Sequence, residues 1–265
     1  MTAGPWRAAA DVVLSVLVPA YNEGPTVARV FDRLAQVPLL LEIIAVDDGS
    51  SDDTGRQLDA LAAQGRIHKV IHHPRNRGKG AAIRTAIAAA TGDVMVVQDA
   101  DLEYDPAELP RLLAPILDGR ADAVYGSRFL GGPHRVLLFW HSVGNTALTL
   151  LSNMLTDLNL TDMETCYKMV RADLMRRLTL TTDRFGFEPE LTARLARANA
   201  RIYELPISYA GRTYAEGKKI DWRDGAAAIW HILRFNLFPP GPPPSPAAAA
   251  PGAPQARDAH TPGVR

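Results

Sequence analysis

The chain has 265 residues, with 29 Lys and Arg against 29 Asp and Glu, so its formal net charge is zero. A hydrophobic fraction of 47% is ample for a buried core and excludes a chain that is disordered throughout. The zero net charge gives no global attraction to nucleic acid, and no nucleic-acid partner is expected. The single cysteine, Cys166, excludes an intrachain disulfide and a zinc site built from cysteines, and we expect it to pack in the core.

Up to about residue 130, apolar runs of strand length alternate with stretches of helical length. Strands are predicted at 12–18, 41–46, 67–72, 94–97 and 121–125, and helices at 25–36, 51–64, 80–90 and 106–117. The first run is a nearly continuous stretch of Val and Leu, as expected for a strand that is buried on both faces. This alternation predicts an α/β protein with a Rossmann-like, mostly parallel sheet covered by helices.

The second half of the chain is less regular. Helical spacing of large apolar residues predicts helices at 137–158, 189–198 and 221–238, with a strand at 202–209. His141, Asn145 and Asp157 interrupt the apolar stretch 136–160, so we expect it to be amphipathic and not to span a bilayer.

Nine of the 20 prolines lie between Pro239 and Pro262, in a stretch with almost no large apolar residues. Such a composition predicts a disordered tail at 239–265.

Polar clusters follow four of the predicted strands. They are PAYNE at 19–23, DDGS at 47–50, QDADLE at 98–103 and GSR at 126–128. In an open parallel sheet, ligands bind at the carboxyl ends of the strands. Four clusters at corresponding ends therefore indicate a single site.

Asp99 and Asp101 are the sharpest element of these clusters. Two carboxylates one residue apart, just past a buried strand, can share Mg²⁺ or Mn²⁺ with substrate phosphates and water. The alternative is a capped turn before the helix at 106–117. The spacing alone is a weak signal, and the other three clusters favour the metal site.

Five segments, in chain order, resemble an inverting family 2 glycosyltransferase with the GT-A fold: VPAYNE, VDDGSSDDT, NRGKGAAIRTAI, QDADLEYDP and GSRF. Three later segments are similar to the dolichyl- or polyprenyl-phosphate sugar synthase branch, which includes dolichol-phosphate mannosyltransferases: TDMETCYKMVR, GFEPEL and ELPISYAGRTYAEGKKIDWRDG. The resemblance covers about residues 12–225. It implies one glycosyltransferase domain at 12–238, with a donor and metal half at 12–130 and an acceptor half at 131–238, after an extension at 1–11.

The resemblance also implies the donor site. It places Pro19, Tyr21 and Glu23 at the nucleotide base and Asp48 at the nucleoside, and it gives Asp99, Ala100 and Asp101 to the metal and the diphosphate, with Glu103 as a further metal ligand. Lys79 precedes a predicted helix in a glycine-rich basic segment, so it contacts the diphosphate or belongs to a solvated turn. Tyr21 is alternatively a packing residue, and Asp47 is as well suited to capping its turn as to touching substrate.

Arginine is suited to binding phosphate through paired hydrogen bonds. The resemblance assigns the lipid phosphate to three arginines, which match Arg128, Arg135 and Arg212 here, and we add Lys218 as a candidate. The alternative for each is a solvated surface charge. Asp101 and Arg128 are the expected catalytic residues.

The implied reaction moves a hexose from a UDP- or GDP-sugar to a polyprenyl phosphate with inversion, and Mg²⁺ or Mn²⁺ is the cofactor. A phosphate monoester is anionic near neutral pH, with a second pKa of ~6, so it needs no general base. A soluble alcohol acceptor would need one, for which Asp101, Glu188 and Glu190 are candidates. A non-catalytic nucleotide-sugar sensor or scaffold is the third interpretation.

The predicted helices at 137–158 and 221–238 carry Trp, Phe and Leu on one face. Such helices can lie in a membrane interface, and we expect peripheral contact with the cytoplasmic membrane face. An internal core face or a dimer interface is the alternative.

The neutral total conceals an asymmetry. Residues 1–120 carry 12 Lys and Arg against 16 Asp and Glu, whereas residues 121–265 carry 17 against 13. The acidic half holds the expected metal and donor residues, and the basic half holds those expected for the acceptor phosphate.

Overall fold

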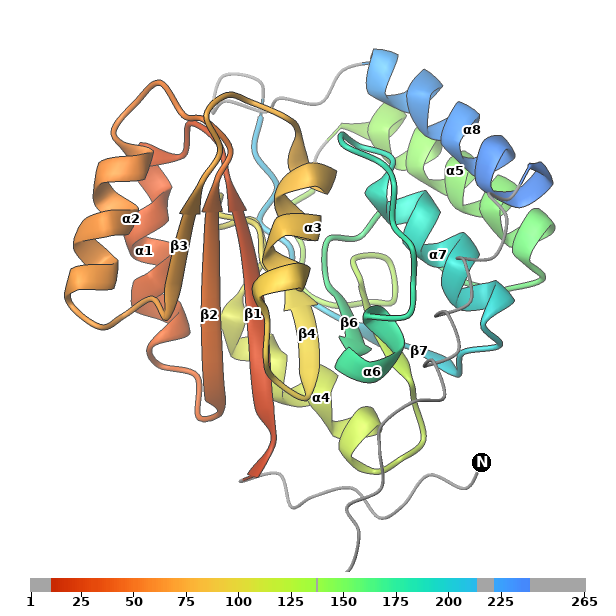
Figure 1. The fold of residues 1–265 in the computed structure, drawn as a ribbon. Coiled ribbons are helices and arrows are strands. Elements are labelled where there is room, and N and C mark those ends of the chain that lie inside the picture. The colour runs from red at the N-terminus through yellow and green to blue at the C-terminus, as the bar shows by residue number, and fades with distance from the viewer. Residues whose placement is uncertain (1–10, 137, 214–221, 239–265) are drawn as a thin grey trace, which may run out of the picture.

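A computed structural model describes residues 11–136, 138–213 and 222–238 (Figure 1). Its strands are β1 (Val13–Ala20), β2 (Leu40–Asp47), β3 (Lys69–His72), β4 (Val94–Val97), β5 (Ala123–Ser127), β6 (Lys168–Arg171) and β7 (Ile202–Pro206). Its helices are α1 (Gly24–Leu34), α2 (Thr54–Ala63), α3 (Lys79–Ala89), the 3₁₀ helix η2 (Pro106–Glu108), α4 (Leu109–Leu117), α5 (Phe139–Thr156), α6 (Ala172–Met175), α7 (Phe187–Arg197) and α8 (Trp222–Leu237).

The strands form one seven-stranded sheet in the order β3-β2-β1-β4-β6-β5-β7. Neighbours pair in parallel except at β6, which is antiparallel to both β4 and β5. The predicted α/β class and mostly parallel sheet are confirmed. Strand β6 was not predicted, because its four residues, KMVR, are too short and too charged for apolar periodicity to reveal them.

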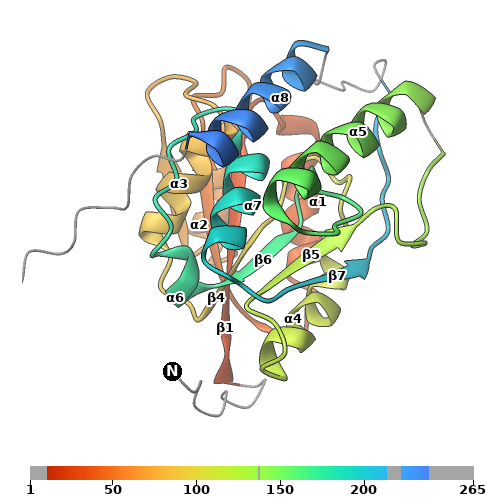
Figure 2. The same ribbon diagram turned by 90° about the vertical axis from the view of Figure 1, so that its right-hand side faces the viewer.

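Helices cover both faces of the sheet. α3 packs on β1 and β2, whereas α4 packs on β5. Turning the molecule by 90° shows α3 and α4 on opposite sides of the strands (Figure 2). The buried core runs through β1 and β4, where Leu14, Val16 and Val96 are among the fully buried side chains. β1, apolar apart from the buried Ser15, is thus buried on both faces, as predicted.

β6 is antiparallel to both of its neighbours, so β5 runs in the same direction as β1, β2 and β4. All four strands therefore end at one edge of the sheet, which brings together the four polar clusters. α5, α7 and α8 pack against one another beside this edge (Figure 1).

The helix starts follow local chemistry. Pro25 occupies the first turn of α1, where its missing N–H costs no hydrogen bond. α2 begins at Thr54, and Asp52 Oδ1 accepts a hydrogen bond from the Thr54 backbone N–H at 3.0 Å. The helix was predicted to begin at residue 51, and it begins three residues later. Asp52 is the residue before it whose side chain satisfies a free backbone N–H of the first turn.

α5 covers most of the stretch 136–160, which is expected to be amphipathic. It carries Asn145 and Asn153 among its apolar residues. Over the ranges that the structure describes, no helix combines the length and apolar character that a membrane crossing requires.

Candidate active site

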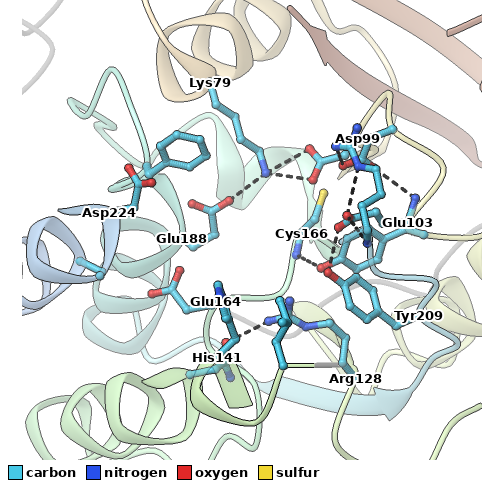
Figure 3. Close-up of a pocket in the computed structure, with 18 of the residues that line it drawn as sticks. Lys79, Asp99, Glu103, Arg128, His141, Glu164, Cys166, Glu188, Tyr209 and Asp224 are labelled. Atoms are coloured by element: carbon cyan, nitrogen blue, oxygen red, sulfur yellow. Dashed lines mark hydrogen bonds and ion pairs between the residues drawn. The ribbon is translucent and has the colours of Figure 1, made fainter. Parts of the chain in front are cut away.

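Every described residue of the predicted site lines one pocket of about 1140 Å³ at the carboxyl edge of the sheet (Figure 3). These residues are Pro19, Tyr21, Glu23, Asp48, Lys79, Asp99, Ala100, Asp101, Glu103, Arg128, Arg135 and Arg212. Lys218 lies outside the described residues. The structure thus brings together side chains that are up to 193 residues apart in the sequence, from Pro19 to Arg212.

Asp48 holds the loop that leads into α3. Its carboxylate accepts hydrogen bonds from the backbone N–H groups of Arg77, at 3.0 Å, and Gly78, at 2.6 Å, and its Oδ1 lies 2.6 Å from His73 Nδ1. Gly78 has φ +103°, and a Cβ there would lie 2.4 Å from the Asp183 carbonyl oxygen. Only glycine fits this backbone, so Asp48 and Gly78 together fix the position of the following Lys79.

The neighbouring carboxylate, Asp47, has a different task. Its Oδ1 accepts the Ser50 backbone N–H at 3.0 Å, and its Oδ2 lies 3.1 Å from His72 Nδ1. Asp47 is absent from the pocket lining. Of its two predicted roles, the structure supports the capped turn.

Lys79 is a half-buried cation between two carboxylates. Its Nζ lies 3.0 Å from both Asp99 Oδ1 and Glu188 Oε1. Burial lowers the pKa of Lys79, but Asp99 and Glu188 outweigh it and raise that pKa well above its usual range. Lys79 is therefore a fixed positive charge in the pocket, and the solvated-turn alternative is wrong.

Asp99, Ala100 and Asp101 directly follow β4. Burial, together with the charges of Asp99 and Glu103, raises the pKa of Asp101 to about 7, although Arg212 acts in the opposite direction. The Arg212 guanidinium lies 2.8 Å from Asp101 Oδ2, 3.2 Å from Glu103 Oε1 and 3.4 Å from Glu23 Oε2. A cation therefore already sits among these carboxylates.

The donor set fits Mg²⁺ or Mn²⁺. Asp99 and Asp101 supply hard oxygen ligands, and a divalent cation would relieve the repulsion between them, which adds to burial in raising the pKa of Asp101. Among the described residues, no three His, Cys, Asp or Glu side chains are grouped as ligands for one ion. Such an ion would take its other ligands from phosphate oxygens and water, which is the usual arrangement for Mg²⁺.

Glu103 and Tyr209 anchor the chain segment that carries Arg212. Glu103 Oε1 accepts the backbone N–H of Arg212 at 2.9 Å, and Oε2 accepts the Tyr209 hydroxyl at 2.8 Å. These two hydrogen bonds hold the segment that follows β7 against the pocket. As the structure stands, Glu103 binds this segment, while its predicted role as a metal ligand stays a prediction.

Arg128 follows β5 and is held in a single orientation. Its Nε and Nη2 donate to the two oxygens of Asp162, each at 2.7 Å, and Nη2 also donates to Asn145 Oδ1 at 3.0 Å. Its guanidinium carbon lies 5.2 Å from the centre of the Tyr209 ring. Burial lowers the pKa of Arg128, but Tyr104 and Asp162 hold it well above its usual range.

Asp162 is the partner of Arg128, and sequence reasoning missed this pair. It lies in the TDMET segment, whose spacing carries no sign of a contact with Arg128 34 residues earlier. Glu204 positions the backbone of Asp162, whose N–H donates to Glu204 Oε1 at 3.1 Å. Arg135 is more exposed, and its Nη1 donates to the Gly211 carbonyl at 3.2 Å.

Two of the candidate general bases, Glu188 and Glu190, differ in whether they line the pocket. Glu190 is fully buried, accepts hydrogen bonds from Thr181 and Thr182 and pairs with Arg194, and it is absent from the pocket lining. The structure therefore rules it out as a base. Glu188 lines the pocket, as do Glu164 and Cys166, for which no pocket role was predicted. Cys166 also belongs to the core, as expected.

Comparisons with known proteins identify the family to which this chain belongs. The profile of Glycosyl transferase family 2 matches residues 15–179. An undecaprenyl-phosphate mannosyltransferase of Micrococcus luteus is 32% identical over 244 residues, which cover 83% of this chain and 97% of that protein. A polyprenol monophosphomannose synthase of Mycolicibacterium smegmatis is 30% identical over 77% of this chain and 79% of that protein.

Among solved structures, the glucosyl-3-phosphoglycerate synthase of Mycobacterium tuberculosis, in complex with Mn²⁺ and UDP-glucose, matches with a TM-score of 0.68. The two are 24% identical, and the match covers 87% of this chain and 81% of that one, so it supports the GT-A fold alone. The profile match and the Micrococcus relative supply the family. This chain belongs to glycosyl transferase family 2.

Proposed function

We propose that the protein transfers a hexose from a nucleotide-sugar to a polyprenyl phosphate. The observation that carries the choice of acceptor is the composition of the pocket mouth. Val136, Phe139 and Trp140 are 88%, 70% and 77% exposed, and they line the same pocket as Arg128 and Arg135. Apolar side chains beside arginines suit a molecule that is anionic at one end and hydrocarbon beyond it.

The opposite end of the pocket suits the donor. Asp99, Asp101 and Lys79 lie together at the end of β4 and the start of α3. Lys79 presents a fixed positive charge to the diphosphate, and Asp99 and Asp101 would hold the metal ion. When bound there, Mg²⁺ or Mn²⁺ supplies Lewis-acid neutralisation of the departing diphosphate.

The acceptor phosphate needs orientation and not deprotonation. With a second pKa of ~6, a phosphate monoester is already a nucleophile at neutral pH. Arg128 is locked by Asp162 before substrate arrives, so it can bind the acceptor phosphate without reorganisation. A single displacement with the acceptor opposite the leaving diphosphate inverts the anomeric carbon.

We further propose that α5 and α8 contact the membrane that carries the acceptor. They pack against each other and expose Val143, Leu150 and Met154 from α5 and Ile229, Trp230 and Leu237 from α8. An apolar face of this kind suits a membrane interface. The single free cysteine suits a reducing compartment, so we place the contact at the cytoplasmic membrane face.

The test is a mass-spectrometric screen of UDP- and GDP-sugars with undecaprenyl phosphate in detergent, with and without Mn²⁺. A parallel screen offers a water-soluble alcohol as acceptor. We expect a metal-dependent sugar-phosphate-lipid product. Transfer to the alcohol alone would favour a soluble acceptor, and donor binding without any transfer would favour a sensor.

A further inference from the structure

One wall of the pocket is more acidic than the proposed chemistry requires. Glu164 and Glu188 lie one beyond the other between Lys79 and Arg128, and Asp224 lies on the same side (Figure 3). Glu188 is bound to Lys79 at 3.0 Å. Glu164 differs, because its Oε1 is buried and has no hydrogen-bond partner among the residues that the structure describes.

A buried carboxylate oxygen without a partner is costly, so this atom indicates a missing hydrogen-bond donor. The two cations that act on Glu164 are Lys168 and Arg128. Lys168 Nζ donates to the Met163 and Thr165 carbonyls, and Arg128 is bound to Asp162. A molecule bound in the pocket, either water or a substrate hydroxyl group, would supply the missing donor.

The order of the pocket places the sugar beside this wall. With the nucleoside expected near Pro19 and Tyr21 and the diphosphate proposed at Asp99 and Lys79, the sugar would extend from the diphosphate toward Arg128. Glu188 and Glu164 lie along that path (Figure 3). This step rests on the donor half of the proposed function.

We propose that Glu164 accepts a hydrogen bond from a hydroxyl group of the donor sugar and, together with Glu188, restricts the donor to neutral hexoses by repelling hexuronates. A hexuronate would bring a third carboxylate to a wall that already holds two. Its ionised acid group only accepts hydrogen bonds, so this group could not donate one to Glu164. Burial and the charge of Glu188 raise the pKa of Glu164 to about 7, which shows how poorly this wall tolerates further negative charge.

Donor pairs that differ only in the oxidation of C6 test the proposal directly. Calorimetry with Mn²⁺ compares UDP-glucose with UDP-glucuronate, UDP-galactose with UDP-galacturonate, and GDP-mannose with GDP-mannuronate. For the nucleotide that the protein binds, we expect the hexose to bind at least about 30-fold more tightly than its acid. This comparison uses the unaltered protein and needs no variant to fold.

Variants then assign the effect to Glu164. Glu164→Gln keeps an oxygen that accepts the hydroxyl but removes the charge, so the hexose-to-acid ratio should fall toward one while hexose binding is retained. Glu164→Leu should lose hexose affinity by about tenfold, with the thermal unfolding of both variants recorded. Asp118→Asn, a charge removal at an exposed side chain, should leave the ratio unchanged.

The outcomes separate this inference from the proposed function. Equal binding of hexose and acid, or an unchanged ratio in folded Glu164→Gln, overturns the role of Glu164. If the hexose preference holds but no lipid product forms, the polyprenyl phosphate acceptor is wrong and the inference stands. Binding of no donor at all overturns both.

Discussion

Replacing Asp162 with Asn tests whether Arg128 is held in place by its partner. The Asp162 side chain is fully buried and that of Arg128 is 17% exposed. Breaking a buried pair by removing one charge costs ~3–5 kcal/mol, because the other charge is left uncompensated. Asn retains one of the two oxygens at 2.7 Å, and Arg128 has some access to solvent, so we expect the free energy of unfolding to fall by ~2–3 kcal/mol.

The same change should impair the reaction. Without one of its two side-chain hydrogen bonds to residue 162, Arg128 can rotate, and a small misplacement of a positioning group costs ~10²-fold in rate. We therefore expect kcat/KM for polyprenyl phosphate to fall by about 10²-fold while donor affinity changes little. Urea denaturation gives the stability change, and initial rates at varied lipid concentration give the kinetic change.

Asp118→Asn is the matched control, because the Asp118 and Arg120 side chains are each 54% exposed. Loss of such a surface pair costs ~0.2–1 kcal/mol at most and should not alter turnover. If Asp162→Asn behaves like this control in both measurements, the proposed positioning of Arg128 by Asp162 is refuted.

Three further changes address the donor, the metal and the membrane. Asp101→Asn should abolish Mn²⁺-dependent transfer, and near-normal metal-dependent turnover would contradict the metal site. Lys79→Met leaves Asp99 and Glu188 uncompensated, so we expect the KM for the nucleotide-sugar to rise by ~10–100-fold in steady-state rates, whereas an unchanged KM would place the diphosphate elsewhere. Replacing Leu150 and Met154, which are exposed on α5 and absent from the pocket lining, together with Ser should weaken binding to phosphatidylglycerol vesicles in co-sedimentation but preserve transfer to a short-chain, water-soluble polyprenyl phosphate. Loss of both would indicate a structural role.

Sequence reasoning reached the parts of the site that obey a general rule. Asp99 and Asp101 line one pocket with the other predicted residues because the carboxyl ends of parallel strands meet at one edge. Asp48 was placed there too, but its hydrogen bonds to Arg77 and Gly78 depend on how a loop folds back, which no spacing encodes.

The interactions that sequence reasoning missed depend on long-range packing. Asp162 meets Arg128 because β6 inserts antiparallel between β4 and β5, and the four residues of β6 gave no periodic signal. Arg212 was predicted for the acceptor phosphate, yet it lies among Glu23, Asp101 and Glu103. That position follows from the folding of a segment 111 residues beyond Asp101.

The connection between β5 and β6 also affects how this fold can vary. The chain leaves the sheet after Ser127, runs through α5 and comes back at Thr161, and the Ser127 and Thr161 hydroxyl oxygens lie 2.6 Å apart. A segment with such closely joined ends can be lengthened at little entropic cost and without moving the end of β4 or the start of α3, where Asp99 and Lys79 lie. The architecture thus allows the proposed acceptor-facing part, with Phe139 and Trp140, to vary while the residues proposed to hold the sugar-nucleotide stay in place.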